Sequence, residues 1–191
     1  YATPARLAEL LRRDELDAAL VSTTEVLFSE RYDILDGIAI ASLGEVKSVF
    51  LAHRRPLAEM DRVFCDAASL TSVNLLRVLL AERGLRPEFR PLEPLDLAAL
   101  PDYFLLIGNP ALDFARSPRT HELWDLGEAW TELTRLPMVY AVWALRRGVE
   151  QFGQSDRKRF KHGVQRDTCA QMLNLGRHHR RACRPPGPAA P

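Results

Sequence analysis

The predicted fold is decided by residues 62–112, which read RVFCDAASLTSVNLLRVLLAERGLRPEFRPLEPLDLAALPDYFLLIGNPAL. Strands and helices alternate in this stretch, with a strand over 62–66, a helix over 73–83, and strands over 85–92 and 103–107. The helix has one apolar stripe, formed by Leu75, Leu76, Leu79 and Leu80, and Gly84 ends it as a C-cap. This alternation predicts an α/β fold with a parallel sheet and right-handed crossovers.

Polar residues follow two of these strands. Ser69, Thr71 and Ser72 come after the first strand, and Gly108-Asn109 comes after another. In open parallel sheets, ligands bind beyond the carboxyl ends of the strands. The serine and threonine turn also meets a helix N-terminus, whose free N–H groups and positive dipole end attract a carboxylate. An ordinary helix cap accounts for one of these hydroxyls, so the other two favour a ligand site.

The remaining elements predict two lobes joined by two crossings. Further strands are expected over 18–21, 37–41, 46–53 and 138–145, and helices over 4–13 and 125–133. We assign residues 1–53 and 137–153 to lobe one, 54–136 to lobe two, and 154–191 to a basic, disordered tail. Such an architecture closes on a ligand by hinge motion. Ser22 and Thr23 end the first strand, where they either cap the next helix or line the cleft.

Charge is distributed unevenly along the 191 residues, although the net charge is only +1. Residues 154–191 hold nine basic and two acidic residues, a net charge of +7. The other 153 residues hold 17 basic and 23 acidic residues, a net charge of −6. The tail lacks a recognition motif and interleaved aromatic residues, so we predict no nucleic-acid partner.

Several classes of protein and site are disfavoured by the sequence. No run of 18 apolar residues is present, so we expect no membrane span. Three scattered cysteines indicate a reducing compartment rather than a disulfide framework. His53 and His121 have no triad partners at motif spacing. The tail carries one group of metal-ligand residue types in a spacing that matches no standard zinc site, namely Cys169, His178, His179 and Cys183. We therefore predict no metal and no cofactor.

Six blocks of the sequence resemble the chorismate dehydratase family of the futalosine route to menaquinone. The blocks are Glu15–Ser22, Gly44–Val49, Ser69–Val73, Leu105–Leu112, Asp125–Trp130 and Leu136–Ala144. They occur in one order with compatible spacings, and the resemblance runs from about Thr3 to Val149. Several blocks together make the resemblance specific.

The resemblance implies the two-lobed fold of type 2 periplasmic binding proteins, in enzymes that are cytoplasmic. It also implies a carbon–oxygen lyase that removes water from chorismate to give 3-[(1-carboxyvinyl)oxy]benzoate, without a cofactor. The substrate is a small dicarboxylate, which needs accurately placed hydrogen-bond donors. Under this hypothesis the cleft is lined by Ser22, Thr23, Ser48, Ser69, Thr71, Ser72 and Asn109. No catalytic residue is assigned.

The chain departs from the family pattern in three places. A family strand carrying a catalytic candidate Asn would precede Tyr1, position 70 is leucine instead of a basic residue, and residues 154–191 do not resemble the family's C-terminal helices. We therefore expect marginal stability and little or no activity from this chain alone.

Two other functions stay open. One is a non-catalytic solute-binding module for a small carboxylate ligand. The other is the sister enzyme that acts on cyclic dehypoxanthine futalosine with a histidine base. A histidine near position 108 would mark that enzyme, and Gly108-Asn109 argues against it.

Overall fold

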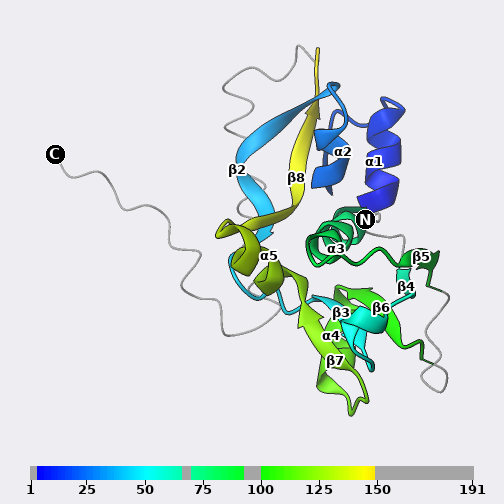
Figure 1. The fold of residues 1–191 in the computed structure, drawn as a ribbon. Coiled ribbons are helices and arrows are strands. Elements are labelled where there is room, and N and C mark those ends of the chain that lie inside the picture. The colour runs from blue at the N-terminus through cyan, green and yellow to red at the C-terminus, as the bar shows by residue number, and fades with distance from the viewer. Residues whose placement is uncertain (1–3, 66–69, 93–99, 149–191) are drawn as a thin grey trace. The chain divides into compact units, whose positions relative to one another are not determined.

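The computed structural model describes residues 4–65, 70–92 and 100–148. Two separate sheets organise the described residues (Figure 1), one of three strands and one of five. Two short segments cross between them, residues 43–48 and residues 135–137. The tail 154–191, for which we predicted disorder, lies outside the described residues.

The three-stranded sheet is antiparallel, in the order β1-β8-β2. Its strands are β1 (Ala18–Ser22), β8 (Met138–Arg146) and β2 (Tyr32–Ser42). Helix α1 (Pro4–Arg12) packs against β1, and α2 (Thr23–Leu27) follows that strand directly. Ser22 is therefore both the last residue of β1 and the residue before α2.

The five-stranded sheet has the order β5-β4-β6-β3-β7. Its strands are β5 (Glu88–Pro91), β4 (Arg62–Cys65), β6 (Tyr103–Ile107), β3 (Val49–His53) and β7 (Glu122–Asp125). The parallel pairing that we predicted holds for β4 with β5 and β6. Strand β3, for which no parallel pairing was predicted, runs antiparallel to β6 and β7. Antiparallel strands need no helix between them, so the alternation of strands and helices does not predict the direction of β3.

Strand β3 belongs to the five-stranded sheet, whereas we assigned residues 1–53 to lobe one. Residues 49–52 are all buried, which requires cover on both faces of the strand. Val49 and Leu51 pack into one core cluster, and Phe50 and Ala52 pack into another on the opposite face of the strand. The predicted strand over 37–41 is longer, starting at Tyr32, and the one over 85–92 is shorter, Glu88–Pro91. The assignment of whole lobes stays a prediction.

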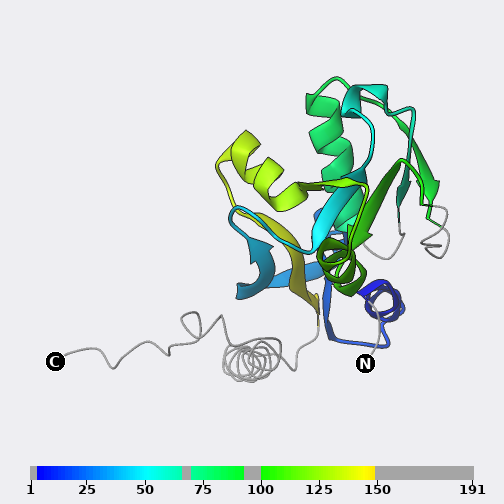
Figure 2. The ribbon, with the colours of Figure 1, turned by 90° about the horizontal axis from the view of Figure 1, so that it is seen from below.

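Helix α3 (Leu70–Glu82) begins earlier than the predicted start at Val73, so Thr71 and Ser72 belong to its first turn. The predicted apolar stripe is confirmed, because Leu75, Leu76, Leu79 and Leu80 are all buried. The helix contacts α2, β8 and α5 (Leu126–Thr134). Figures 1 and 2 both place it between α5 and the β4–β5 side of the five-stranded sheet.

Three short elements were not predicted. They are the 3-10 turn η1 (Leu57–Glu59), α4 (Asn109–Arg116) and strand β7. The start of α4 lies directly after β6, where Gly108 takes a φ of 69° and Pro110 occupies the first turn. Glycine and proline at this junction suggested a turn, but proline is also favoured at the first position of a helix.

Candidate functional site

Two hydroxyls that are 49 positions apart in the sequence meet in the structure. Ser22 Oγ at the end of β1 forms a hydrogen bond with Thr71 Oγ1 in the first turn of α3. The backbone N–H and the hydroxyl of Thr24 each approach Thr71 Oγ1 at 3.4 Å. Ser72 follows in the same turn and is 1% exposed, while Thr71 is 4% exposed. We call Ser22, Thr24, Thr71 and Ser72 the hydroxyl cluster.

The structure argues against one of the two roles left open for Ser22, the capping of α2. Its side chain makes no capping hydrogen bond to α2, and it contacts Thr71 instead. At the start of α3, the first backbone N–H groups have no partners within the helix. The first turn of α3 carries no acidic residue that would neutralise the positive end of the helix dipole. The cluster thus combines hydroxyl groups with a helix end that favours negative charge.

Thr23 has a different role from Ser22. Its hydroxyl donates to the backbone carbonyl of Val139 at 2.9 Å, which ties the start of α2 to β8. This hydroxyl is engaged in holding the fold. This role was not predictable from the sequence, because the bonding partner of Thr23, Val139, lies 116 positions further along the chain.

Ser48 and Asn109 form a second group of predicted site residues. The carbonyl of Ser48 accepts a hydrogen bond from the backbone N–H of Gly108 at 2.8 Å. Asn109 follows Gly108 as the exposed first residue of α4. The Ser48 hydroxyl is 3.5 Å from the carbonyl of Val46, a long contact. Ser69, the remaining predicted site residue, lies outside the described residues.

A cavity of about 380 Å³ adjoins the hydroxyl cluster through Thr24. Its lining is Arg12, Thr24, Glu25, Phe28, Ser29, Arg31, Tyr32 and Leu70. Arg12 Nε lies 3.5 Å from Glu25 Oε1, and burial, followed by the charge of Glu25, raises the pKa of Tyr32. This cavity was not predicted, because its walls come from three separate stretches of the sequence, namely Arg12, residues 24–32 and Leu70.

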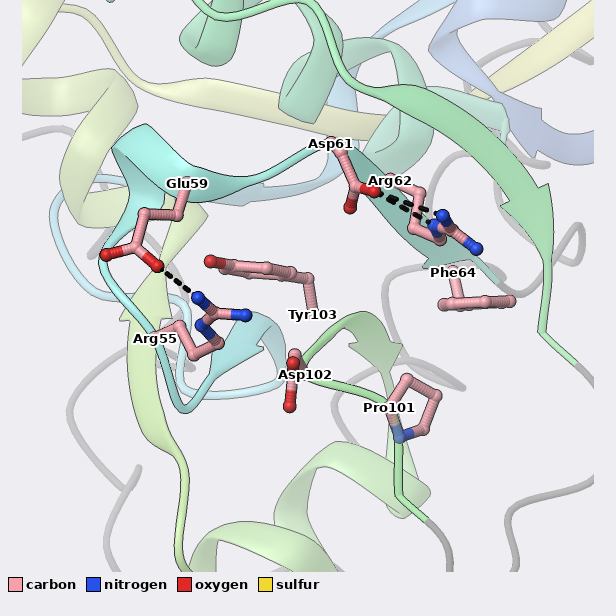
Figure 3. Close-up of a pocket in the computed structure, with 8 residues that line it drawn as sticks. All are labelled: Arg55, Glu59, Asp61, Arg62, Phe64, Pro101, Asp102 and Tyr103. Atoms are coloured by element: carbon pink, nitrogen blue, oxygen red, sulfur yellow. Dashed lines mark hydrogen bonds and ion pairs between the residues drawn. The ribbon is translucent and has the colours of Figure 1, made fainter.

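A larger cavity of about 620 Å³ contains none of the predicted site residues (Figure 3). It is lined by Arg55, Glu59, Asp61, Arg62, Phe64, Pro101, Asp102 and Tyr103. Four of its charged side chains bind one another, with Arg55 at 2.5 Å from Glu59 and Arg62 at 3.1 Å from Asp61 (Figure 3), and Asp102 lies 2.8 Å from Arg54. Tyr103 donates to the carbonyl of Pro56 at 2.8 Å. We therefore place the candidate site at the hydroxyl cluster and not in this cavity.

The two histidines of the described residues have structural contacts. His121 is buried, and its Nε2 donates to the carbonyl of Pro101 at 2.8 Å. His53 Nδ1 lies 3.1 Å from the carbonyl of Arg55. Within the described ranges, no three His, Cys, Asp or Glu side chains come together as metal ligands. The tail residues that we considered for zinc, Cys169 to Cys183, lie outside those ranges.

The chain matches known proteins over most of its length. The family described as menaquinone biosynthesis matches residues 1–172. A chorismate dehydratase from Thermus thermophilus is 36% identical over 164 residues, which cover 77% of this chain. The chain spans 60% of that relative's length.

Solved structures agree on the fold. A protein from Archaeoglobus fulgidus superposes with a TM-score of 0.62 at 20% identity, over 89% of this chain and 63% of that one. The periplasmic aliphatic sulphonate binding protein from Escherichia coli gives a TM-score of 0.55 at 16% identity, over 86% of this chain and 58% of that one. The predicted periplasmic-binding-protein-like α/β fold is thereby confirmed. Among the described residues, no helix is long and apolar enough to span a membrane.

Proposed function

The chain belongs to the menaquinone biosynthesis family, and we propose that it binds chorismate and serves its dehydration to 3-[(1-carboxyvinyl)oxy]benzoate. The observation that carries this proposal is the hydroxyl cluster at the start of α3, in a chain 36% identical to a chorismate dehydratase. A small dicarboxylate substrate and a cytoplasmic location are parts of the same proposal.

The reaction suits a site made of hydroxyls and backbone N–H groups. The ring carbon that bears the enolpyruvyl ether loses its proton, and the neighbouring carbon loses its hydroxyl group. The proton and the hydroxyl leave as water, and the ring becomes aromatic, which provides the driving force. Because the driving force lies in the substrate, the protein has to hold two carboxylates in position more than it has to supply a strong base. In this proposal the substrate's own enolpyruvyl carboxylate takes the proton.

One carboxylate is assigned to the first turn of α3. Thr71 and Ser72 would present their hydroxyls and the free backbone N–H groups of that turn. Hydrogen bonds to a charged group contribute about 1.5–3 kcal/mol each, or roughly 10- to 100-fold in affinity. Thr24 connects this turn to the cavity of about 380 Å³, which offers room for the rest of a small ligand.

The test is binding and turnover of chorismate by the chain and by the double variant Thr71→Val with Ser72→Ala. Calorimetry measures affinity, and absorbance with mass spectrometry follows the aromatic product, beside the Thermus relative as a positive control. We expect the double variant to lose at least about tenfold in affinity. Ser117→Ala is the matched control, because that hydroxyl is exposed and donates to the carbonyl of Asp113 in the adjoining helix α4.

The outcomes separate the competing functions. Chorismate binding that the double variant loses supports the proposed site. Binding that the double variant keeps, with a melting temperature equal to the parent's, refutes the placement at α3. Tight binding of another small carboxylate, without binding of chorismate, would favour the solute-binding module instead.

A further inference from the structure

Asp125 is the last residue of β7 and is only 8% exposed. Its carboxylate accepts hydrogen bonds from four backbone N–H groups. Two of them belong to Gly127 and Glu128, at 2.9 and 3.0 Å, and cap helix α5. The other two belong to Val46 and Lys47, at 3.0 and 2.8 Å, on the crossing segment 43–48. One buried carboxylate therefore joins the start of α5 to a segment almost 80 positions away.

The crossing segment depends on this carboxylate for its shape. Lys47 has a φ of 62°, in the left-handed region that residues with a Cβ disfavour. Its side chain is exposed and lies 3.4 Å from Glu45, a neighbour on the same segment. The backbone is instead held from the α5 side, by Asp125 and by Thr131 Oγ1, which accepts the N–H of Gly44 at 2.8 Å. Unusual backbone conformations persist where their surroundings hold them.

Ser48 connects the crossing segment to the start of α4. Ser48 follows Lys47 directly, and its carbonyl accepts the N–H of Gly108 at 2.8 Å. Gly108 has a φ of 69° and precedes Asn109, the first residue of α4. The Asp125 carboxylate thus bonds the N–H of Lys47, Lys47 is joined to Ser48 by the chain, and the Ser48 carbonyl bonds the N–H of Gly108.

We propose that Asp125 is a positioning residue, which fixes Ser48 and Asn109 in the ligand site through the backbone of the crossing segment. The identity of the ligand, chorismate, rests on the proposed function, and the membership of Ser48 and Asn109 in its site is what the family resemblance implies. The positioning of the two segments rests on the hydrogen bonds alone and is measurable without a ligand.

Asp125→Asn tests the proposal with little change in size. Oδ1 accepts the bonds of the α5 cap, and Oδ2 accepts the bond of Lys47. An asparagine that keeps its carbonyl oxygen on the cap turns its NH₂ group toward the N–H of Lys47. Two donors then face each other, so the N–H of Lys47 loses its acceptor, while the N–H of Val46 and the cap of α5 keep the carbonyl oxygen.

Asp125→Ser provides a second variant with the same intent. Serine is a good N-cap for α5, but its side chain is too short to hold Val46 and Lys47 as well. Asp61→Asn is the matched control, since Asp61 is an exposed aspartate whose carboxylate lies 3.1 Å from Arg62. If one Asp125 variant has a melting temperature far below that of the parent, the measurements are made on the other variant.

Amide hydrogen exchange by NMR measures the positioning directly. In both Asp125 variants we expect exchange to rise by at least about tenfold at Lys47 and Gly108, and to stay unchanged at Leu76 in the core of α3. Exchange at Val46 should rise in Asp125→Ser only, because asparagine keeps the oxygen that accepts its N–H. Chorismate affinity, measured by calorimetry, should fall by about tenfold. Asp61→Asn should change neither quantity.

Unchanged exchange at Gly108 would overturn the proposed connection between the two segments. Raised exchange with parent-like chorismate affinity would overturn a role for Asp125 in the ligand site. If the parent chain itself fails to bind chorismate, the proposed function is refuted, and exchange at Gly108 alone decides whether Asp125 positions Ser48 and Asn109.

Discussion

Gly127 packs so closely against Ser42 that a Cβ on Gly127 would lie 2.7 Å from Ser42 Oγ. The carbonyl of Gly44 would lie at 2.8 Å and the hydroxyl of Tyr140 at 2.9 Å. One of these three atoms is backbone, so it has little freedom to move away. The first turn of α5 therefore touches the crossing segment without space for a side chain, beside the bonds that Asp125 makes to it.

We expect Gly127→Ala to lower the free energy of unfolding by about 1–3 kcal/mol, the usual effect of an overpacked site. Denaturant unfolding monitored by circular dichroism measures this change. Adding Ser42→Ala should restore only part of the loss, because the Gly44 carbonyl still blocks the new methyl group. Alanine normally stabilises a helix relative to glycine, so a stability gain in Gly127→Ala would contradict the close contact.

His121 makes the stability depend on pH. Burial is the largest cause that lowers its pKa, with a smaller contribution from Arg54, while the bond to Pro101 and the charge of Asp102 oppose the shift. The unfolded chain therefore binds a proton more readily than the folded chain. The free energy of unfolding should fall as the pH drops below about 6.5, the unperturbed value for histidine.

His121→Gln removes this dependence, because glutamine can still donate to the carbonyl of Pro101 but does not titrate. The measurement is the difference in unfolding free energy between pH 7.5 and pH 5 for parent and variant. The variant should lose less stability on acidification. If parent and variant lose the same unfolding free energy on acidification, the pH dependence comes from groups other than His121.

Local patterns in the sequence predicted the elements that depend on nearby residues. The apolar stripe of α3, with Leu76 and Leu80, follows from helical periodicity alone, and these residues are buried as expected. The first turn of α3 was predicted as a preceding loop, because Thr71 and Ser72 are typical of both caps and first turns. The fold class followed from the alternation of strands and helices and from the family resemblance.

Relationships across long stretches of sequence were not predictable in the same way. The antiparallel direction of β3 depends on where the chain enters the five-stranded sheet. The role of Asp125 depends on N–H groups 78 and 79 positions away. Ser22 and Thr71 were predicted to share a site, but their direct contact requires the fold that brings β1 and α3 together.

The contact between Ser22 and Thr71 should appear as a coupling energy. In a double-mutant cycle of Ser22→Ala and Thr71→Val, we expect the two changes to be coupled by about 0.5–1.5 kcal/mol in unfolding free energy. The cycle of Thr134→Val with Thr71→Val is the control, since the Thr134 hydroxyl donates to Trp130 within α5. Additive effects in the first cycle would contradict the hydrogen bond.

Cys65 should be an unreactive thiol in the folded chain. It is 6% exposed, and burial raises its pKa to about 12. The thiolate is the reactive form, so labelling should wait for unfolding. In a background of Cys169→Ser and Cys183→Ser, a chromogenic disulfide reagent should label the native chain slowly and the chain in guanidinium at once. Rapid labelling of the native chain would mean that the end of β4 opens easily.

Tyr32 carries a hydroxyl that has no hydrogen-bond partner among the described residues, although the residue is only 3% exposed. A buried polar group without a partner destabilises a fold by about 1–3 kcal/mol. We therefore expect Tyr32→Phe to raise the free energy of unfolding, or at least to leave it unchanged. Tyr140→Phe is the matched control, because the Tyr140 hydroxyl lies 3.2 Å from Ser42 Oγ and its removal should be destabilising. A loss of stability in both variants would show that Tyr32 has a partner in solution, most simply a water molecule in the adjoining cavity.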